Sequence, residues 1–247
     1  MSLRILTARE RPDLGERGRA TSAVWPLYNV QSPVSGRYWD RLLPELPDHQ
    51  FVLYDEAADE VVAQGHTAPL VWDGSVEGLP DGFDAVLPAA FALLEAGTAP
   101  TTLCALAVQI PERHQGQGHS ATMLRAMVAI AARHGLDALI APVRPSQKER
   151  YPLVPIERYA AWRRDDGLPF DAWMRVHARL GARILRPEPR SLLIPGPVAE
   201  WERWTELRFP ESGDYWFPRG LATVRIDREA DRGVYWEPNV WMLHGVP

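Results

Sequence analysis

The chain has 247 residues, with 27 lysines and arginines against 32 aspartates and glutamates, so its formal net charge is −5. Hydrophobic residues make up 46% and charged residues 24%, which is typical of a globular protein and excludes a disordered chain. The acidic balance argues against a nucleic-acid partner, and no apolar run approaches the ~18 residues of a membrane span.

The N-terminus and the cysteine content indicate a compartment. The opening stretch turns polar after Leu6 and lacks the apolar segment of a signal peptide. Cys104 is the single cysteine, so no intrachain disulfide forms, and we expect a cytoplasmic protein with no membrane partner. The seven histidines include neither a His-Glu-x-x-His pattern nor zinc-ligand spacing, so we expect no metal site.

The first hundred residues predict short elements separated by prolines and a polar loop. Helical or loop-like structure is expected at 12–30 and 36–43, and a short helix at Pro88–Glu95. Three apolar segments predict strands, namely Leu3–Thr7, Phe51–Tyr54 and Val61–Val71.

The middle of the chain has the clearest pattern. Thr101–Ile110 is apolar on both faces, which predicts a central strand covered on both sides. Ser120–His134 has apolar residues at helical spacing, and Gly135 is well placed to end that helix. Leu136–Val143 is a second apolar strand, so these segments predict a βαβ-like unit.

The second half predicts a long connection followed by further elements. Residues 144–170 are rich in arginine, proline and tyrosine and show no regular pattern. Asp171 is a candidate N-cap for a helix that ends before Gly181. Four further segments follow: a strand pair at Ala182–Leu185 and Ser191–Ile194, a helix at Pro197–Leu207, and a hairpin of Leu221–Asp227 and Val234–Leu243.

A glycine-containing loop, Arg113-His114-Gln115-Gly116-Gln117-Gly118, lies between the central strand and the long helix. Backbone N–H groups at a helix N-terminus are unpaired and partly positive, and glycines let an anion approach the backbone closely. The loop is therefore either a plain turn or an anion site. A dinucleotide fingerprint is the weaker interpretation, because Pro111 to Gln115 separate its first glycine from the strand.

The segment from Leu106 to Gly118 resembles the acyl-CoA-binding signature of the GNAT superfamily of N-acyltransferases, Arg/Gln-x-x-Gly-x-Gly/Ala after a central strand. The resemblance implies an α/β (α+β) fold with a mixed, splayed central sheet flanked by helices. It also implies acetyl-CoA, or another acyl-CoA, as the co-substrate. The residues that it places along the cofactor are Val108, Ile110, Arg113, His114, Gln115, Gly116, Gln117, Gly118, His119 and Ser120. Arg144, Lys148 and Arg150 are candidates for its 3′-phosphate.

The resemblance covers residues 1–195, which we expect to form the acyltransferase domain. Residues 196–247 then form a C-terminal extension, a helix plus a β-hairpin packed on that domain. Five of the ten tryptophans lie in the last 47 residues. We favour a core role for them, with the wall of an acceptor pocket or a homodimer surface as alternatives.

Two proton transfers must be assigned for acyl transfer to an amine. The GNAT family commonly uses a tyrosine on the late helix to protonate the departing thiolate, and His177 stands at that position here. Tyr151 and Tyr159 are alternative donors, and a packed structural histidine is an equal interpretation. No general base can be chosen among Asp73, Glu77, Asp165 and Asp166.

The long connection is the expected site of acceptor contacts, through Tyr151, Trp162 and Asp166. The resulting prediction is a cytoplasmic N-acyltransferase that passes an acetyl or other short acyl group directly to the amine of a small molecule or peptide. The alternatives are a non-catalytic acyl-CoA-binding module, a GNAT-like thioester decarboxylase and, last, a dinucleotide-dependent oxidoreductase.

Overall fold

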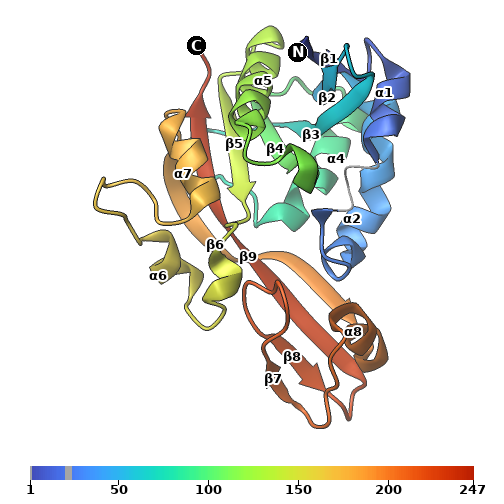
Figure 1. The fold of residues 1–247 in the computed structure, drawn as a ribbon, viewed down its shortest axis with the longest axis vertical. Helices are drawn as coiled ribbons and strands as arrows, with labels where there is room; N and C mark the ends of the chain where they lie inside the picture. The colour runs from blue at the N-terminus through green and yellow to red at the C-terminus, as the bar shows by residue number, and fades with distance from the viewer. Residues whose placement is uncertain (1, 20–23) are drawn as a thin grey trace.

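The computed structural model describes residues 2–19 and 24–247, and its framework is a nine-stranded mixed sheet (Figure 1). The order is β1-β2-β3-β4-β5-β9-β8-β7, and β6 pairs with the other edge of β9. The strands are β1 (Leu3–Thr7), β2 (Gln50–Asp55), β3 (Glu60–Leu70), β4 (Thr102–Gln109), β5 (Ala138–Val143), β6 (Arg183–Gly196), β7 (Gly213–Tyr215), β8 (Val224–Asp227) and β9 (Arg232–Gly245). This mixed sheet flanked by helices confirms the expected fold class.

Helices cover both faces of the sheet. They are α1 (Pro12–Arg17), α2 (Pro33–Tyr38), α3 (Leu42–Glu45), α4 (Val86–Ala96), α5 (His119–Arg133), α6 (Ile156–Ala160), α7 (Ala172–Arg179) and α8 (Val198–Thr205). Short 3-10 turns lie at Asn29–Gln31, Trp39–Arg41, Pro47–His49, Phe83–Ala85, Glu112–His114 and Lys148–Arg150. The predicted segment 12–30 includes α1 and the first of these turns, while its residues 20–23 lie outside the described part of the chain.

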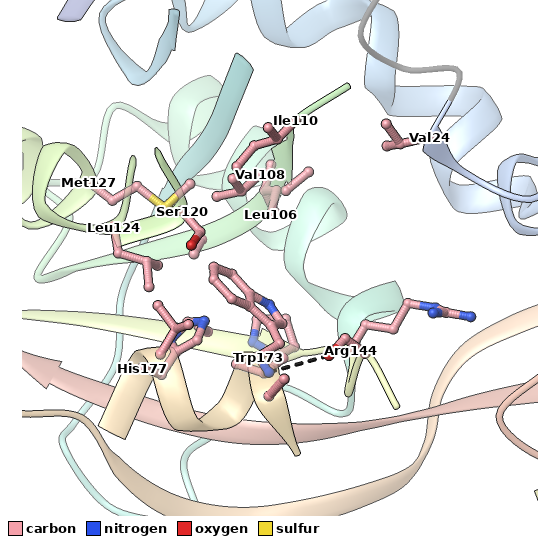
Figure 2. Close-up of a pocket in the computed structure, with 18 of the residues that line it drawn as sticks. Val24, Leu106, Val108, Ile110, Ser120, Leu124, Met127, Arg144, Trp173 and His177 are labelled. Atoms are coloured by element: carbon pink, nitrogen blue, oxygen red, sulfur yellow. Dashed lines mark hydrogen bonds between the residues drawn. The ribbon is translucent and has the colours of Figure 1, made fainter. Parts of the chain in front are cut away.

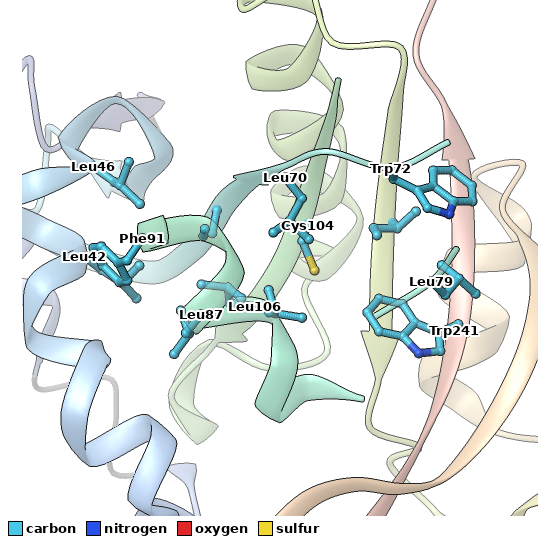
Figure 3. Close-up of a cluster of buried hydrophobic side chains, with 14 residues drawn as sticks. Leu42, Leu46, Leu70, Trp72, Leu79, Leu87, Phe91, Cys104, Leu106 and Trp241 are labelled. Atoms are coloured by element: carbon cyan, nitrogen blue, oxygen red, sulfur yellow. The ribbon is translucent and has the colours of Figure 1, made fainter. Parts of the chain in front are cut away.

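The central strand β4 is buried on both faces, as its sequence predicts. Leu103 packs with α5 on one face, whereas Cys104 and Leu106 pack with Leu87 and Phe91 of α4 on the other (Figure 3). Successive side chains of a strand point to opposite faces, so a covered central strand must be apolar throughout. Burial raises the pKa of the Cys104 thiol, so this thiol is an inert part of the core.

β4 and β5 pair over a short distance and then separate. The parallel register has three pairs, from Thr102 opposite Ala138 to Cys104 opposite Ile140. On its other edge β4 stays paired with β3. A register shift there leaves Leu106 without an opposite residue on β3, as in a β-bulge. The parts of β4 and β5 beyond this point therefore diverge, which opens the sheet in the way that the GNAT resemblance implies.

The second half of the chain differs from the prediction in two places. Where the sequence predicts a pair of strands, the structure has the single strand β6. It pairs with β9 from Arg183 to Gly196, with register shifts on the way. Its prolines are tolerated because β6 is an edge strand. No further strand pairs with its outer side, so an N–H donor missing there costs no hydrogen bond between strands. The connection 144–170 also contains regular structure, since α6 lies within it.

β9 links the central sheet to the C-terminal part of the chain. Its end, Val240–Gly245, pairs with β5, whereas its start, Arg232–Val234, pairs with β8 as the predicted hairpin (Figure 1). Around the start of β9, Trp201 of α8 packs among Tyr28, Phe217 and Tyr235. The tail thus contributes an aromatic core and a strand of the central sheet.

Candidate functional site

A first cavity of about 410 Å³ opens where β4 and β5 diverge (Figure 2). Four elements supply its apolar walls: β4 with the residue after it, α5, α7 and the end of β5. The labelled side chains from these elements are Leu106, Val108 and Ile110; Ser120, Leu124 and Met127; and Trp173 and His177. The diverging edge of β4 offers backbone groups that an extended, amide-bearing ligand can pair with.

A second cavity, of about 320 Å³, adjoins the first. It carries more polar groups, including Asp40, Glu237 and Asn239. Five residues line both cavities, namely Trp25, Leu106, Ala107, Pro142 and Arg144. The two cavities therefore meet at the point where the sheet opens, so ligands in each can approach one another.

The glycine loop stands at one end of the first cavity. Gly116 and Gly118 have φ of +76° and +80°, a region that side-chain-bearing residues rarely adopt. A Cβ atom built on either glycine would meet no atom within 4 Å, so the loop surface is open. Gln115 and Ser120, at the two ends of the loop, line the cavity. This open N-terminus of α5 suits an anion such as a pyrophosphate.

Other predicted cofactor residues hold the loop in place. Arg113 forms an ion pair with Glu60 at 2.6 Å, and Nε2 of His114 lies 3.1 Å from the same carboxylate oxygen. The hydrogen bond from Arg113, then that from His114, lowers the pKa of Glu60. Gln117 donates to the carbonyl of Arg113 at 3.2 Å. These contacts anchor the loop to the start of β3.

His119 is buried at the beginning of α5 and lines neither cavity. Val108 and Ile110 line the first cavity, as the resemblance implies.

His177, the predicted proton donor, lies in the wall of the first cavity. Its Nδ1 is 2.9 Å from Nε2 of His244, and its ring meets the indole of Trp173 edge-on, with centroids 4.4 Å apart. Its Nε2 is buried and has no hydrogen-bond partner in the described part of the chain. Burial, and secondarily His244, lowers the pKa of His177 well below 6.5, so the ring is neutral at pH 7.

The structure does not bring the predicted acceptor residues to either cavity. Tyr151 and Trp162 pack edge-on, 5.0 Å between centroids, in an aromatic cluster with Tyr159 and Phe170. Asp166 lies in an exposed turn, where it accepts a hydrogen bond from the backbone N–H of Leu168. Aromatic side chains in this connection bury themselves against each other, and so they build core rather than a pocket wall.

Two of the three candidate phosphate cations have structural partners, whereas Arg150 is exposed. Lys148 is buried, and its Nζ donates to the carbonyls of Tyr151 and Leu221 at 2.7 Å each. Burial lowers its pKa to about 8. Arg144 points toward Glu237 instead of the glycine loop, and its Nε donates to Oε1 of that carboxylate at 2.9 Å. These two side chains are therefore engaged within the protein.

Sequence reasoning missed the polar wall of the second cavity. The side chain of Glu237 is 3% exposed and also accepts a hydrogen bond from Nδ2 of Asn29 at 2.8 Å. The signal was a carboxylate within a largely apolar and aromatic segment, Val234–Leu243, because such a residue is buried only with partners.

Asp171 caps α7 and fixes the segment before it. Its carboxylate accepts from the backbone N–H groups of Trp173 and Met174, which confirms the predicted N-cap. It also accepts from the backbone of Ser146 and Gln147. The cap therefore positions the helix that carries Trp173 and His177 relative to the end of β5.

None of the helices within residues 2–19 and 24–247 has the length and apolarity needed to cross a membrane. Nor do three or more His, Cys, Asp or Glu side chains in these two ranges gather where they could hold a metal ion.

Known proteins similar to this chain share its fold and extend over its whole length. No family model matches the chain. It is 31% identical, over 273 aligned positions, to the arginine N-acetyltransferase avaD of Aspergillus versicolor, covering 98% of this chain and 93% of that protein. Its fold is similar to the loading GNATL domain of CurA from Lyngbya majuscula, with a TM-score of 0.63, 16% identity and coverage of 100% and 98%. It is also similar to the GphF GNAT-like decarboxylase in complex with isobutyryl-CoA, with a TM-score of 0.59, 17% identity and coverage of 99% and 100%.

Proposed function

Because the chain belongs to the GNAT superfamily and is an acyl-CoA-dependent N-acyltransferase, we propose that it transfers an acetyl group from acetyl-CoA to a nitrogen of an arginine-type acceptor. The observation that carries the proposal is the meeting of two cavities at the diverging edges of β4 and β5. One cavity is apolar with an open anion site, and the other is lined by carboxylate and amide groups.

The first cavity suits acyl-CoA. When bound, the co-substrate supplies the acyl group and a thiolate leaving group. The open edge of β4 near Val108 and Ile110 offers backbone groups to the pantetheine arm. The amides from Gln115 to Ser120 offer donors to the pyrophosphate, and Glu60 holds this loop through Arg113. Trp173 and Met127 contribute apolar surface to the walls of this cavity.

The second cavity suits the acceptor. Guanidinium groups are recognised by carboxylates, with which they form charge-assisted hydrogen bonds. Asp40 and Glu237 supply carboxylates here, and Asn239 supplies an amide. The relative named above is an arginine N-acetyltransferase, which supports the same class of acceptor. The acceptor is then free arginine, a small arginine derivative or an arginine within a peptide.

The nitrogen that is acylated must be neutral when it attacks. An α-amino group with a pKa near ~8 costs roughly 1.4 kcal/mol to deprotonate at pH 7, whereas a guanidinium costs at least about 7 kcal/mol. Acylation of a guanidino nitrogen therefore requires a general base that accepts its proton, and the carboxylate of Glu237, which lines this cavity, is our candidate for that role. His177 stands in the wall of the other cavity, where it donates a hydrogen bond to the departing thiolate.

Two properties outside the site stay predictions. We propose a reducing compartment, the cytoplasm, because Cys104 is a buried free thiol and the sequence has no second cysteine. The second prediction is a homodimer, and light scattering of the purified protein, which measures its molar mass in solution, tests it.

The first experiment is calorimetric titration with acetyl-CoA, with NADPH as the control ligand. We expect micromolar binding of acetyl-CoA alone. Mass spectrometry of reactions with arginine, agmatine, lysine and citrulline then identifies the acceptor class, and fragmentation locates the acetyl group. Acetylation of arginine in preference to citrulline supports the proposal. Release of carbon dioxide from malonyl-CoA without an acceptor, and no acetylated product, would replace it with a decarboxylase.

A further inference from the structure

Two histidines that are 67 positions apart in the chain form a buried pair behind the first cavity. His177 comes from α7 and His244 from the end of β9, and their side chains are 1% and 2% exposed. The ring centroids are 5.1 Å apart, and Nδ1 of His177 lies 2.9 Å from Nε2 of His244. Only one of these two nitrogens can carry the shared proton, so the hydrogen bond runs either from His244 to His177 or from His177 to His244.

The second nitrogen of His177 lacks a partner. Nε2 is buried and unpaired within the described residues, although its ring lines the first cavity. A buried polar atom without a hydrogen bond is costly, and it is usually retained where a ligand or water completes it. Trp173 packs edge-on against the ring and restricts its rotation. The unpaired nitrogen is therefore held in a fixed orientation.

Neither ring is an imidazolium at neutral pH. Burial lowers the pKa of His244 to about 4 and that of His177 well below 6.5. A neutral imidazole is a donor at one nitrogen and an acceptor at the other. If His244 donates through Nε2, the proton of His177 must sit on its own Nε2, the nitrogen that has no partner among the described residues. In the opposite arrangement Nε2 of His177 is a bare acceptor, which would repel the lone pairs of a thiolate.

We propose that His244 is a positioning residue, which donates its Nε2–H to Nδ1 of His177 and so keeps a proton on the unpartnered Nε2 of His177, available to a thiolate that departs into the first cavity. This inference rests on the proposed function, since it needs a thiolate that leaves into the first cavity.

The proton can reach the sulfur without charging either ring. As the C–S bond breaks and sulfur keeps its electron pair, His177 gives its Nε2 proton to sulfur. His177 gains the Nε2 proton of His244 at Nδ1, and His244 takes a proton from water at its own Nδ1. The hydroxide that remains takes up the proton that the acylated nitrogen loses, so the overall charge is unchanged. Both rings end neutral in the opposite tautomer. After product release, Nε2 of His177 takes a proton from water, the shared proton returns from Nδ1 of His177 to Nε2 of His244, and Nδ1 of His244 gives its proton back to water, which restores the starting state.

The first test is ¹⁵N NMR of the wild-type protein without ligand at pH 7, with labelled histidine. We expect His177 to be protonated at Nε2 and His244 to be protonated at Nε2, with His177 Nδ1 bare. Protonation of His177 at Nδ1 would overturn the inference. This measurement does not depend on turnover, so it separates the inference from the proposed acetyl transfer.

The second test is the variant His244→Phe. We expect kcat to fall about 100-fold or more, the scale of a lost proton donor, while the dissociation constant of acetyl-CoA stays within about twofold. His177→Phe should behave in the same way, and the pair of changes together should cost no more than either alone. The control is His49→Phe, which removes a ring that pairs with His134 away from both cavities. Wild-type kcat in a folded His244→Phe protein would overturn the inference.

If His244→Phe does not fold, the wild-type protein still decides the question. We expect a plot of kcat against the fraction of D₂O in the solvent to be curved, because two protons move in the same step. A linear plot would mean that one proton moves, which would overturn the inference. A wild-type protein that binds no acetyl-CoA or acetylates no acceptor contradicts the proposed function instead.

Discussion

Nε of Arg144 donates to Oε1 of Glu237 over 2.9 Å, although the two residues are 93 positions apart. Arg144 directly follows β5 and Glu237 lies within β9, between the part that pairs with β8 and the part that pairs with β5. Their side chains are 18% and 3% exposed. Nη2 of Arg144 also donates to the hydroxyl of Tyr28 at 3.0 Å, so the pair ties the N-terminal wall of the site to the central sheet.

Removing one partner of this pair should be costly. We expect Glu237→Ala to lower the free energy of unfolding by roughly 3 kcal/mol, because it leaves the guanidinium of Arg144 largely buried without a counter-ion. Denaturant unfolding followed by tryptophan fluorescence measures this change. Acetylation of arginine should fall with it, whereas acetyl-CoA binding should stay close to that of the wild type.

The double variant Arg144→Met/Glu237→Leu separates stability from recognition. Replacing both charges by apolar side chains should restore most of the lost stability, since no uncompensated charge remains. It should not restore acceptor turnover. A double variant that acetylates arginine normally would show that the pair is purely structural.

Asp40 should contribute to the preference for a cationic acceptor. Its side chain lines the second cavity but is 88% exposed, so its Coulomb attraction is screened by water. We expect Asp40→Asn to lower kcat/KM for arginine about two- to fivefold, with little change for citrulline, which has no charge at that end. Asp214→Asn, which removes an exposed, arginine-paired carboxylate far along the chain, is the matched control.

Local chemistry explains which parts of the fold could be predicted. The strand β4, the helix α5 and the cap at Asp171 follow from patterns within a few residues, namely apolar periodicity, a positive-φ glycine and a side chain that can bond a helix N-terminus. The glycine loop was found for the same reason. Gly116 and Gly118 adopt the backbone region that their residue type favours.

The acceptor side could not be predicted because it is assembled from distant segments. Asp40 comes from the 3-10 turn Trp39–Arg41, Arg144 from the end of β5 and Glu237 from β9, and no local pattern encodes that these three line one cavity. Tyr151 and Trp162 pack in an aromatic cluster and line neither cavity, which shows that aromatic content alone does not distinguish a pocket wall from a packed cluster. His177 was identified by its place in the late helix, but its partner His244 lies 67 positions further along the chain, on β9.

The glycine loop offers a sharp test of the cofactor site. We expect Gly118→Asp to weaken acetyl-CoA binding by at least about 100-fold, because a carboxylate ~4 Å from a phosphate costs about 4 kcal/mol at an effective dielectric constant of 20. Gly118→Ala should lose stability, about 1–2 kcal/mol from the strained φ, but much less affinity.

Gly97→Asp is the matched control for the loop variant. Gly97 also has a positive φ, +63°, and open space around a Cβ atom, but it ends α4 away from both cavities. Calorimetry should show normal acetyl-CoA binding in this variant. Unchanged affinity in a folded Gly118→Asp protein would remove the loop from the cofactor site.

Buried histidines should make the protein sensitive to mild acid. Burial lowers the pKa of His66 and His244 to about 4, against about 6.5 in the unfolded chain. Between these values the unfolded state binds more protons than the folded state, so stability is full above pH 6.5 and falls as the pH drops toward 4. Each ring should cost about 2 kcal/mol between pH 7 and pH 5, a window above the titration of most carboxylates. Urea unfolding at the two pH values measures the loss in the free energy of unfolding. The variant His66→Gln lacks one of these rings, so its loss should be smaller by about the contribution of one ring. Equal stability at pH 7 and pH 5 would mean that these rings are hydrated in solution.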